Sequence, residues 1–321
     1  MFKQLKGFLV LSSLLLAPFG LALAAGSAIP GTVNYVEGQV SIAGQPVTPQ
    51  DIGSAQLQTN QVLQTGQGRA EMLLTPGVFL RLGDNSSVRL ISPNLGDTRV
   101  ELLQGRAIVE VTEIFKDSNL AVLLDGASAR LDKPGLYSFD ADGRQVRVFD
   151  GKASVQADNR NVNLDQDRQL ALMPPFRATR FDAKAQASLD PLYGWSNLRS
   201  EYEAEASMQS ARTVFVGGGS YWDGPGWYWN SYWDMYGFIP GDGIWYSAFG
   251  WPFYSPWLAY SYRGYGYGFH GQGFVAGARH ITGSALAARG GSESARIGGG
   301  GFASRGFAGG MHGGFGGGGH R

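Results

Sequence analysis

The chain has 321 residues with 26 basic and 26 acidic side chains, so its formal net charge is zero, and it contains no cysteine. This composition excludes disulfide bonds and thiolate metal sites. The charge is slightly acidic up to Thr213 and slightly basic beyond it, and neither part is basic enough to indicate a nucleic-acid partner.

Residues 1–25 have the three parts of a secretory signal peptide. Two lysines precede a short apolar run from Phe8 to Leu16, and the small-residue triplet Ala22-Leu23-Ala24 follows. The alternative, an uncleaved membrane anchor, needs about 20 unbroken apolar residues, and Pro18 shortens this run. We therefore expect an exported chain, in the periplasm, at the cell surface or outside the cell, with no integral membrane span after cleavage.

Residues 31–175 show the pattern of short β-strands separated by turns. Four similar motifs each place a glycine before alternating apolar residues: Gly38–Ile42, Gly68–Met72, Gly105–Val109 and Gly151–Val155. Glycine adopts positive φ without strain, so each motif is typical of a turn that enters a half-buried strand. The motifs recur at unequal intervals, which excludes a solenoid of identical repeats. We predict a mainly β fold, a twisted antiparallel β roll or sandwich.

Alternation along these strands separates interior from solvent-facing positions. The apolar residues expected in the core are Val40, Ile42, Leu63, Ala70, Met72, Leu74, Leu80, Leu82, Val88, Leu90, Leu102, Val109, Val122, Leu124, Phe139, Val146, Val148 and Val155. The charged residues expected to face water are Arg69, Glu71, Arg81, Arg89, Glu101, Arg144 and Arg147.

Residues 182–212 change to a helical period, with apolar residues at steps of three and four and three glutamates largely off that stripe. The stripe consists of Leu192, Trp195, Leu198, Tyr202 and Ala206, and the glutamates are Glu201, Glu203 and Glu205. We predict one amphipathic helix here. A helix of this length needs a surface for its apolar stripe, and packing on the β domain is favoured over binding to a partner.

Residues 217–269 are rich in glycine and aromatic side chains, and residues 270–321 are rich in glycine with few apolar anchors. Seven of the eight tryptophans lie in the first stretch: Trp222, Trp227, Trp229, Trp233, Trp245, Trp251 and Trp257. So much aromatic surface exceeds what a soluble monomer leaves exposed, so something must cover it. We expect a largely irregular C-terminal region, with a disordered tail over 270–321.

The β region resembles the FecR domain, an extracytoplasmic module known from regulators of iron-citrate transport and found in many exported bacterial proteins. The resemblance covers roughly Gly31 to Met173. It is carried by Gln61–Met72 with the strand Val78–Leu82, by Gly105–Val109, by Gly135–Phe139 and by Val146–Val155. It implies a FecR-like roll of twisted antiparallel strands that is used for contacts rather than for chemistry.

The chain also departs from that family. The regulators carry a cytoplasmic anti-sigma segment and a membrane span before this domain, whereas a signal peptide is expected here. Asp165-Gln166-Asp167 stands where the family often has a glycine turn. Iron signalling and sigma-factor control are therefore not carried over by the resemblance, which implies the fold and the compartment.

No residue pattern indicates an enzyme, and we expect no cofactor. The four histidines, His270, His280, His312 and His320, all lie in the glycine-rich end, where nothing rigid would hold a catalytic base or a metal ion. Asp140 with Asp142, and Asp165 with Asp167, could form carboxylate pairs for glycoside cleavage. Each pair adjoins a turn signal, so a turn role is favoured.

The seven tryptophans of residues 217–269 are the candidate site. Their faces suit sugar rings and amphipathic surfaces, and packing as an extension of the core competes evenly with that function. The first hypothesis is an exported non-enzymatic FecR-like module that makes protein or envelope contacts, with a signalling or scaffold role. The alternative is a structural or adhesive envelope protein whose aromatic region binds polysaccharide or self-associates.

Overall fold

The computed structural model describes residues 28–217, 222–261 and 280–281. The expected signal peptide at 1–25 lies outside the described residues, as does the expected tail at 270–321 apart from 280–281. Within the described part no helix is long and apolar enough to cross a membrane.

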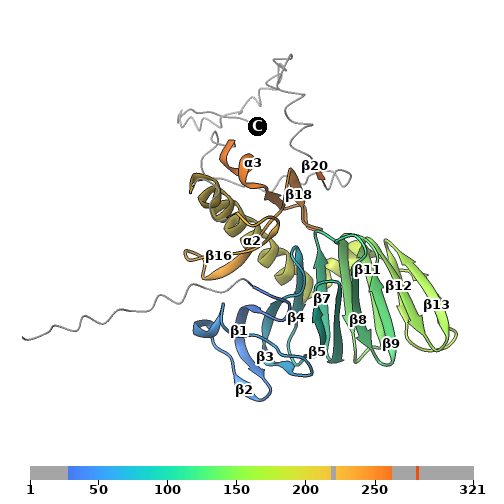
Figure 1. Ribbon diagram of the computed structural model, residues 1–321. Helices are drawn as coiled ribbons and strands as arrows, with labels where there is room; N and C mark the ends of the chain where they lie inside the picture. The colour runs from blue at the N-terminus through green and yellow to red at the C-terminus, as the bar shows by residue number, and fades with distance from the viewer. Residues whose placement is uncertain (1–27, 218–221, 262–279, 282–321) are drawn as a thin grey trace, which may run out of the picture. The chain divides into compact units, whose positions relative to one another are not determined.

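One folded sheet forms the β region (Figure 1). Its first layer contains β5 (Ser87–Asn94), β6 (Asp97–Gln104), β8 (Asn119–Leu124), β9 (Ala127–Leu131), β12 (Lys152–Ala157) and β13 (Arg160–Asp165). Its second layer contains β4 (Val78–Leu82), β7 (Arg106–Val111), β10 (Gly135–Asp140), β11 (Gln145–Asp150), β14 (Arg168–Ala171) and β15 (Thr179–Arg180). All described strand pairs are antiparallel except β6 with β8.

The long strand β3 (Val62–Leu73) joins the two layers. Its first residues pair with β5 and its last with β4. Its whole length pairs with β1 (Val33–Ile42), which also pairs with the short β2 (Gln45–Pro46); the 3-10 turn η1 (Pro49–Asp51) follows. At the other end of the order β13 contacts β14. The sheet therefore closes on itself as a flattened roll, which confirms the predicted fold class.

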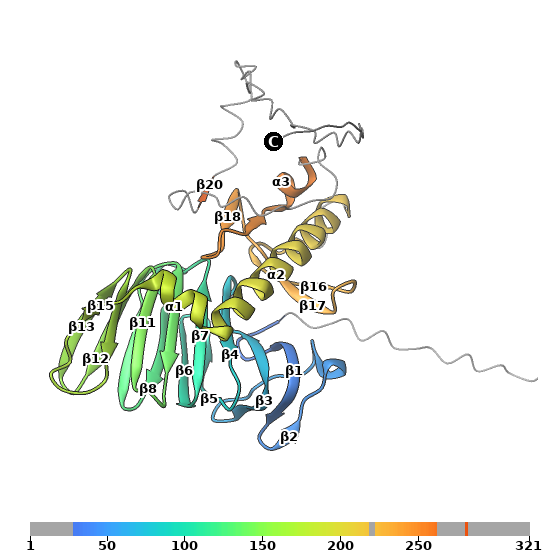
Figure 2. The same cartoon turned by 180° about the vertical axis from the view of Figure 1, so that it is seen from behind.

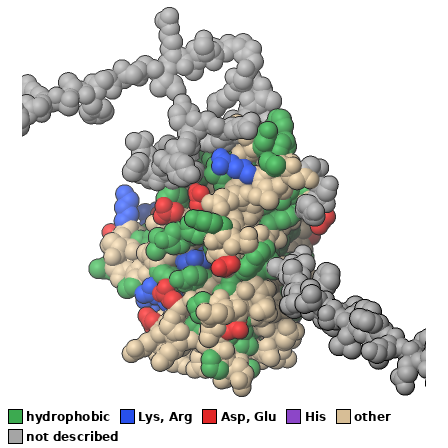
Figure 3. All heavy atoms as spheres, turned by 90° about the vertical axis from the view of Figure 1, so that its left-hand side faces the viewer, with side chains coloured by type: hydrophobic (Ala, Val, Ile, Leu, Met, Phe, Trp, Pro, Cys, Tyr) green, Lys and Arg blue, Asp and Glu red, His purple; other side chains and the backbone are tan. Residues whose placement is uncertain are grey.

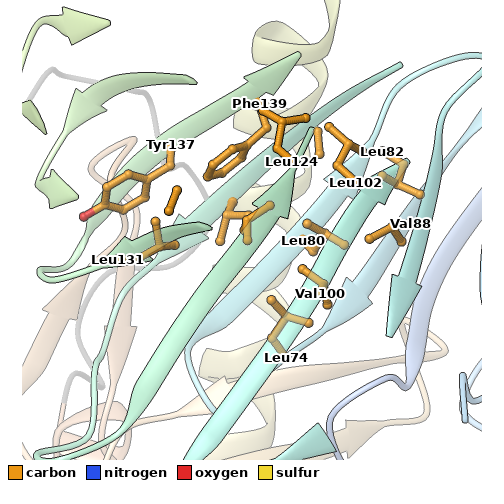
Figure 4. Close-up of a cluster of buried hydrophobic side chains, with 14 of the residues drawn as sticks. Leu74, Leu80, Leu82, Val88, Val100, Leu102, Leu124, Leu131, Tyr137 and Phe139 are labelled. Carbon is orange, nitrogen blue, oxygen red and sulfur yellow. The ribbon is translucent and has the colours of Figure 1, made fainter. Parts of the chain in front are cut away.

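The core of the roll lies between the layers. Leu80 and Leu82 of the second layer face Val88 and Leu102 of the first, and all are buried (Figure 4). All the core positions expected from alternation belong to this cluster except Ile42, which is partly buried and packs against it. Period-two patterning located this core because each strand has one face turned to the other layer.

Three of the four motif glycines have positive φ, as their pattern predicts: Gly38, Gly105 and Gly151. Gly68 differs, since its φ is not in that region. A Cβ at Gly68 would lie 2.4 Å from the carbonyl oxygen of Glu37. Its role is thus close backbone approach between β1 and β3 rather than a turn.

The outer face of the second layer is covered by helix α2 (Pro191–Val216), with the short helix α1 (Ala183–Leu189) before it (Figure 2). Asp190 begins α2, because its side chain accepts a hydrogen bond from the backbone N–H of Leu192 at 2.9 Å. The expected helix at 182–212 is thus one short and one long helix, and the long one lies on the β domain as predicted.

The buried face of α2 differs from the predicted stripe. Leu192, Trp195 and Ala206 are buried, but Leu198 and Tyr202 are 44% and 38% exposed. Small and charged residues take their place on the buried face: Ser196, Arg199, Ser200, Glu203, Ala204 and Ser207. Small side chains let the helix lie close to its neighbours, and the buried charged residues form hydrogen bonds with the sheet beneath, as described below.

Residues 222–261, here named the aromatic segment, form a further layer over α2 and the sheet. The hairpin of β16 (Gly226–Asn230) and β17 (Met235–Ile239) comes first, followed by β18 (Ile244–Tyr246) with β19 (Pro252–Tyr254) and by helix α3 (Pro256–Ser261). Strand β20 (His280–Ile281) pairs with β18. Gly237 of β17 contacts α2 directly: a Cβ there would lie 2.8 Å from the backbone nitrogen of Ser207.

Candidate functional site

A buried ionic cluster lies where α2 meets the sheet. Glu71 of β3, Arg81 of β4 and Glu110 of β7 are adjacent on the outer face, because each follows one residue after a core position. Arg81 donates from Nε to Glu71 at 2.7 Å and from Nη1 to Glu110 at 2.6 Å. All three side chains are fully buried. The prediction that Glu71 and Arg81 face water is wrong, because these strands are covered on both faces.

Helix α2 completes the cluster. Arg199 donates from Nη2 to Glu71 at 2.9 Å, and Ser200 donates to Glu110 at 2.9 Å. Glu203 is fully buried one turn after Arg199, whose Nη2 lies 3.4 Å from its Oε1. Glu203 was expected largely off the packed stripe of the helix, and that expectation is also wrong.

Asn34 of β1 connects this cluster to the aromatic segment. Its amide nitrogen donates to Glu203 at 2.6 Å, to Glu71 at 3.2 Å and to the backbone carbonyl of Tyr236 at 3.1 Å. Its side-chain oxygen accepts from the backbone N–H of Tyr236 at 2.8 Å. One amide thus fixes strand β17 to the sheet and to the helix at the same point.

The protonation states in the cluster follow from its charges. The guanidinium groups of Arg199 and Arg81 outweigh the cost of burial and hold the pKa of Glu71 well below its ordinary value. The pKa of Glu203 is raised well above its ordinary value by burial and by the charge of Glu71. The raised pKa favours the protonated form of Glu203, and two arginines then face the two carboxylates of Glu71 and Glu110. The cluster ties α2 to the strands beneath it.

The aromatic segment packs on the same face of the sheet. Trp227 lies edge-on to Phe79 of β4, with ring centroids 5.0 Å apart, and Phe253 stacks on Phe79 at 6.2 Å. Phe238 contacts both Trp227 and Phe253. Trp227 and the phenylalanines are buried. The tryptophans were expected either to extend the core or to form an exposed platform. Trp227 extends the core, so the first alternative holds for part of the segment.

The remaining tryptophans are distributed over the surface of this layer and do not form one flat platform. Trp222, Trp229, Trp233, Trp245 and Trp251 are partly buried, and Trp257 is 62% exposed. Six of the seven line three separate hollows in pairs: Trp233 with Trp251, Trp227 with Trp229, and Trp222 with Trp257. Trp245 packs against the buried aromatic cluster.

We name the hollow that contains Trp233 and Trp251 the aromatic groove. It has a volume of about 220 Å³ and lies between α2, the turn after β16 and the start of β19. Tyr202 and Met208 of α2 line it, together with Tyr254 of β19. Figure 3 shows the face that carries α2, β16 and α3, where apolar side chains lie beside acidic ones.

Local hydrogen bonds hold the walls of the aromatic groove. Asn230 accepts the backbone N–H of Trp233 at 3.2 Å and donates to the carbonyl of Ala206 on α2 at 3.0 Å. The indole of Trp251 donates to Asn197 of α2 at 2.9 Å. The ring of Trp233 lies 5.6 Å from that of Tyr202. These contacts attach the turn after β16 and Trp251 to α2, which forms one side of the groove.

Sequence reasoning found the tryptophans of this groove but missed its helical side. Glu201 and Glu205 line it together with Tyr202. The spacing of the two glutamates was the sequence feature that could have indicated this side. Two acidic residues one helical turn apart repel each other unless a cation lies between them.

The other predicted constellations have structural roles. Asp140 accepts the backbone N–H of Gly143 at 2.6 Å, and Asp142 accepts that of Gly105 at 3.2 Å, so this pair serves turns as favoured. Among the described residues no group of His, Asp and Glu side chains is arranged to hold a metal ion. His270, His312 and His320 lie outside the described residues.

The comparisons with known proteins concern the roll. No curated protein matches the chain. Two crystal structures of a putative anti-sigma factor from Parabacteroides distasonis ATCC 8503 are similar to it at 18% and 17% identity, with TM-scores of 0.36 and 0.35. Each similarity covers 40% of this chain and 64% or 65% of the other, so this chain spans less than two thirds of those proteins.

The family comparison concerns the strands from β3 to β12. Residues 61–154 match the model of the family described as FecR protein. This segment contains two of the four glycine motifs and the first four residues of Gly151–Val155, whereas Gly38–Ile42 lies before it. Residues 61–154 are therefore similar to FecR, as the motifs predicted.

Proposed function

We propose that this chain is an exported, non-enzymatic FecR-like module that makes contacts with an envelope protein, with a signalling or scaffold role. The FecR match supports a regulatory rather than a catalytic module. The observation that carries the proposal is the way in which α2 and the aromatic segment are held on the outer face of the second layer. Buried ion pairs and aromatic contacts fix both on the roll, and together they display shaped hollows.

The placement of the exposed aromatic residues supports the same proposal. Tyr232 is 79% exposed and Trp257 is 62% exposed, and both belong to the aromatic segment rather than to the roll. Aromatic and methionine side chains around a hollow are enriched at protein–protein interfaces. The outer face of the first layer is different: the hollow over β8, β9 and β12 is lined by serine, asparagine, glutamine and arginine.

A site-specific photo-crosslinking experiment tests the contact. A benzoyl-phenylalanine is placed at Tyr232 of the full chain and, as a matched control, at the exposed Gln156 of β12. We expect crosslinks to a polypeptide of the cell envelope from position 232 and none of that species from position 156. Equal products from both positions, or products found with cytosolic proteins alone, would contradict the proposal.

Sequencing the N-terminus of the chain extracted from the cell tests export. A first residue at position 25 or 26 is expected after cleavage of the signal peptide. An intact Met1 in a cytosolic fraction contradicts export.

A second function remains a candidate, because Trp222 and Trp257 line a further apolar hollow beside Phe215. In that function the aromatic segment binds envelope polysaccharide or a second copy of the chain. Crosslinks from position 232 to glycan alone, or to a second copy alone, would favour it over the contact with another protein.

A further inference from the structure

We propose that the aromatic groove binds an arginine side chain of a partner polypeptide, with the guanidinium group against the aromatic rings and its charge toward Glu201 and Glu205. This inference rests on the proposed function, since it names the chemistry of the contact. Three observations on the described residues carry it: the placement of the two carboxylates, the aromatic walls and the size of the hollow.

The two carboxylates lack a cation of their own. Glu201 and Glu205 lie one helical turn apart and line the same hollow. Among the described residues neither is in an ion pair, although Glu205 accepts a weak hydrogen bond from Gln209 at 3.3 Å. Like charges at this spacing disfavour a helix by about 0.2–0.5 kcal/mol. A cation bound between them would remove that repulsion.

The basic residues of α2 are engaged elsewhere. Arg199 is 4% exposed and donates into the buried ionic cluster. Arg212 donates to the backbone carbonyl of Ala259 at 3.0 Å. The helix therefore presents an acidic edge to the hollow. This charge favours a cationic occupant over a neutral or an acidic one.

The walls suit a planar cation. Tyr202, Trp233, Trp251 and Tyr254 all line the hollow, and cations are attracted to the faces of such rings, most strongly to tryptophan. A guanidinium group also stacks on aromatic rings and donates in a planar fork to carboxylates, which an ammonium group does not. Arginine therefore fits this combination of rings and carboxylates better than lysine does.

The size of the hollow favours a single side chain. Its volume of about 220 Å³ is below the roughly 300–1,000 Å³ typical of sites for whole small ligands. The lining is also nearly all apolar below the two carboxylates, with Met208 and Pro252 among the residues. A sugar ring would have few groups there to bind its hydroxyls, so we favour a polypeptide over a glycan.

The test uses the full chain and the peptide acetyl-Gly-Arg-Gly-amide, with the citrulline peptide as an uncharged isostere. Binding is followed at low ionic strength through the indole NMR signals of Trp233 and Trp251. We expect saturable shifts of both signals with the arginine peptide and at least tenfold weaker binding of the citrulline peptide, which corresponds to about 1.4 kcal/mol. Equal binding of the two peptides would overturn the proposal.

Two pairs of variants locate the site. E201Q with E205Q should weaken binding of the arginine peptide at least tenfold. D117N with D158N makes the same change of charge at exposed turns on the roll and should leave binding unchanged. Loss of affinity in both double variants to the same extent would show unspecific attraction to an acidic protein and overturn the proposal, as would retention of affinity in E201Q with E205Q.

The same titration separates a glycan from a polypeptide. Saturation of the Trp233 and Trp251 signals by chitotetraose, without a response to the arginine peptide, would overturn the proposal in favour of a glycan. The crosslinking test from position 232 does not depend on the charge of the partner. A failed arginine titration with a successful envelope crosslink therefore rejects this inference alone and leaves the proposed function in place.

Discussion

Replacing Arg81 with methionine is expected to cost far more stability than the same replacement at Arg89. Each arginine lies on a strand of the roll and forms an ion pair with a glutamate on a neighbouring strand. Arg81 and its partners Glu71 and Glu110 are fully buried. Arg89 and Glu101 are 40% and 31% exposed. The pair of variants thus compares one residue type in two environments.

The expected loss of unfolding free energy depends on which carboxylates each variant leaves without an arginine partner. In R81M, Glu71 keeps the guanidinium of Arg199, whereas Glu110 keeps only the hydroxyl of Ser200. An uncompensated buried charge costs about 3–5 kcal/mol, a large share of the roughly 5–15 kcal/mol that stabilises a typical protein. R89M exposes one carboxylate to water and removes a surface pair worth about 0–1 kcal/mol.

Urea unfolding followed by circular dichroism measures both values. Adding Glu110→Gln to R81M removes the orphaned carboxylate and should recover part of the loss, which keeps the test informative if R81M alone does not fold. A loss in R81M below about 1 kcal/mol, similar to that of R89M, would refute the view that this cluster is buried and charge-balanced.

Two further predictions concern the same interface. Because the pKa of Glu203 is raised in the folded chain, the native state keeps a proton that the unfolded chain releases near its ordinary value of 4.5. The free energy of unfolding should then fall as the pH rises above that value, by at most about 1.4 kcal/mol per pH unit. E203Q should remove this fall in urea titrations at several pH values, whereas E201Q should keep it. Gly237→Ala should destabilise the protein by about 1–3 kcal/mol through overpacking against Ser207, whereas Gly226→Ala, whose Cβ meets nothing nearer than 3.8 Å, should change the unfolding midpoint little.

The roll could be predicted because its inner face obeys a simple rule. Leu80 and Leu82 alternate with Phe79 and Arg81, and the core residues were identified from that alternation. The same rule failed for Arg81 because it assumes that the second face of a strand is solvated. That holds for a sheet covered on one side, but the second layer is covered on both sides. The apolar Phe79 beside Arg81 was the sign of this second cover.

The candidate groove could be predicted only in part, for a related reason. A tryptophan-rich segment indicates that much aromatic surface must be buried, but it does not indicate which tryptophans are buried. Trp227 became core because Phe79 and Phe238 surround it, whereas Trp257 remained 62% exposed. The helical side of the groove followed from the orientation of α2, and that orientation is set by Arg199 and Glu203. Neither residue belongs to an apolar stripe, so apolar periodicity alone predicted the wrong buried face for α2.

The ionic cluster explains how a chain so rich in aromatic residues adopts one arrangement. Hydrophobic burial is strong but non-directional, and the buried face of α2 is made largely of small residues that would tolerate sliding along the sheet. The hydrogen bond from Arg199 to Glu71 is directional, and Asn34 holds Tyr236 at the same point. Buried polar groups specify register in some proteins, and these contacts oppose such sliding. The walls of the aromatic groove come from α2 and from two parts of the aromatic segment, so its shape depends on contacts made on the opposite side of the helix.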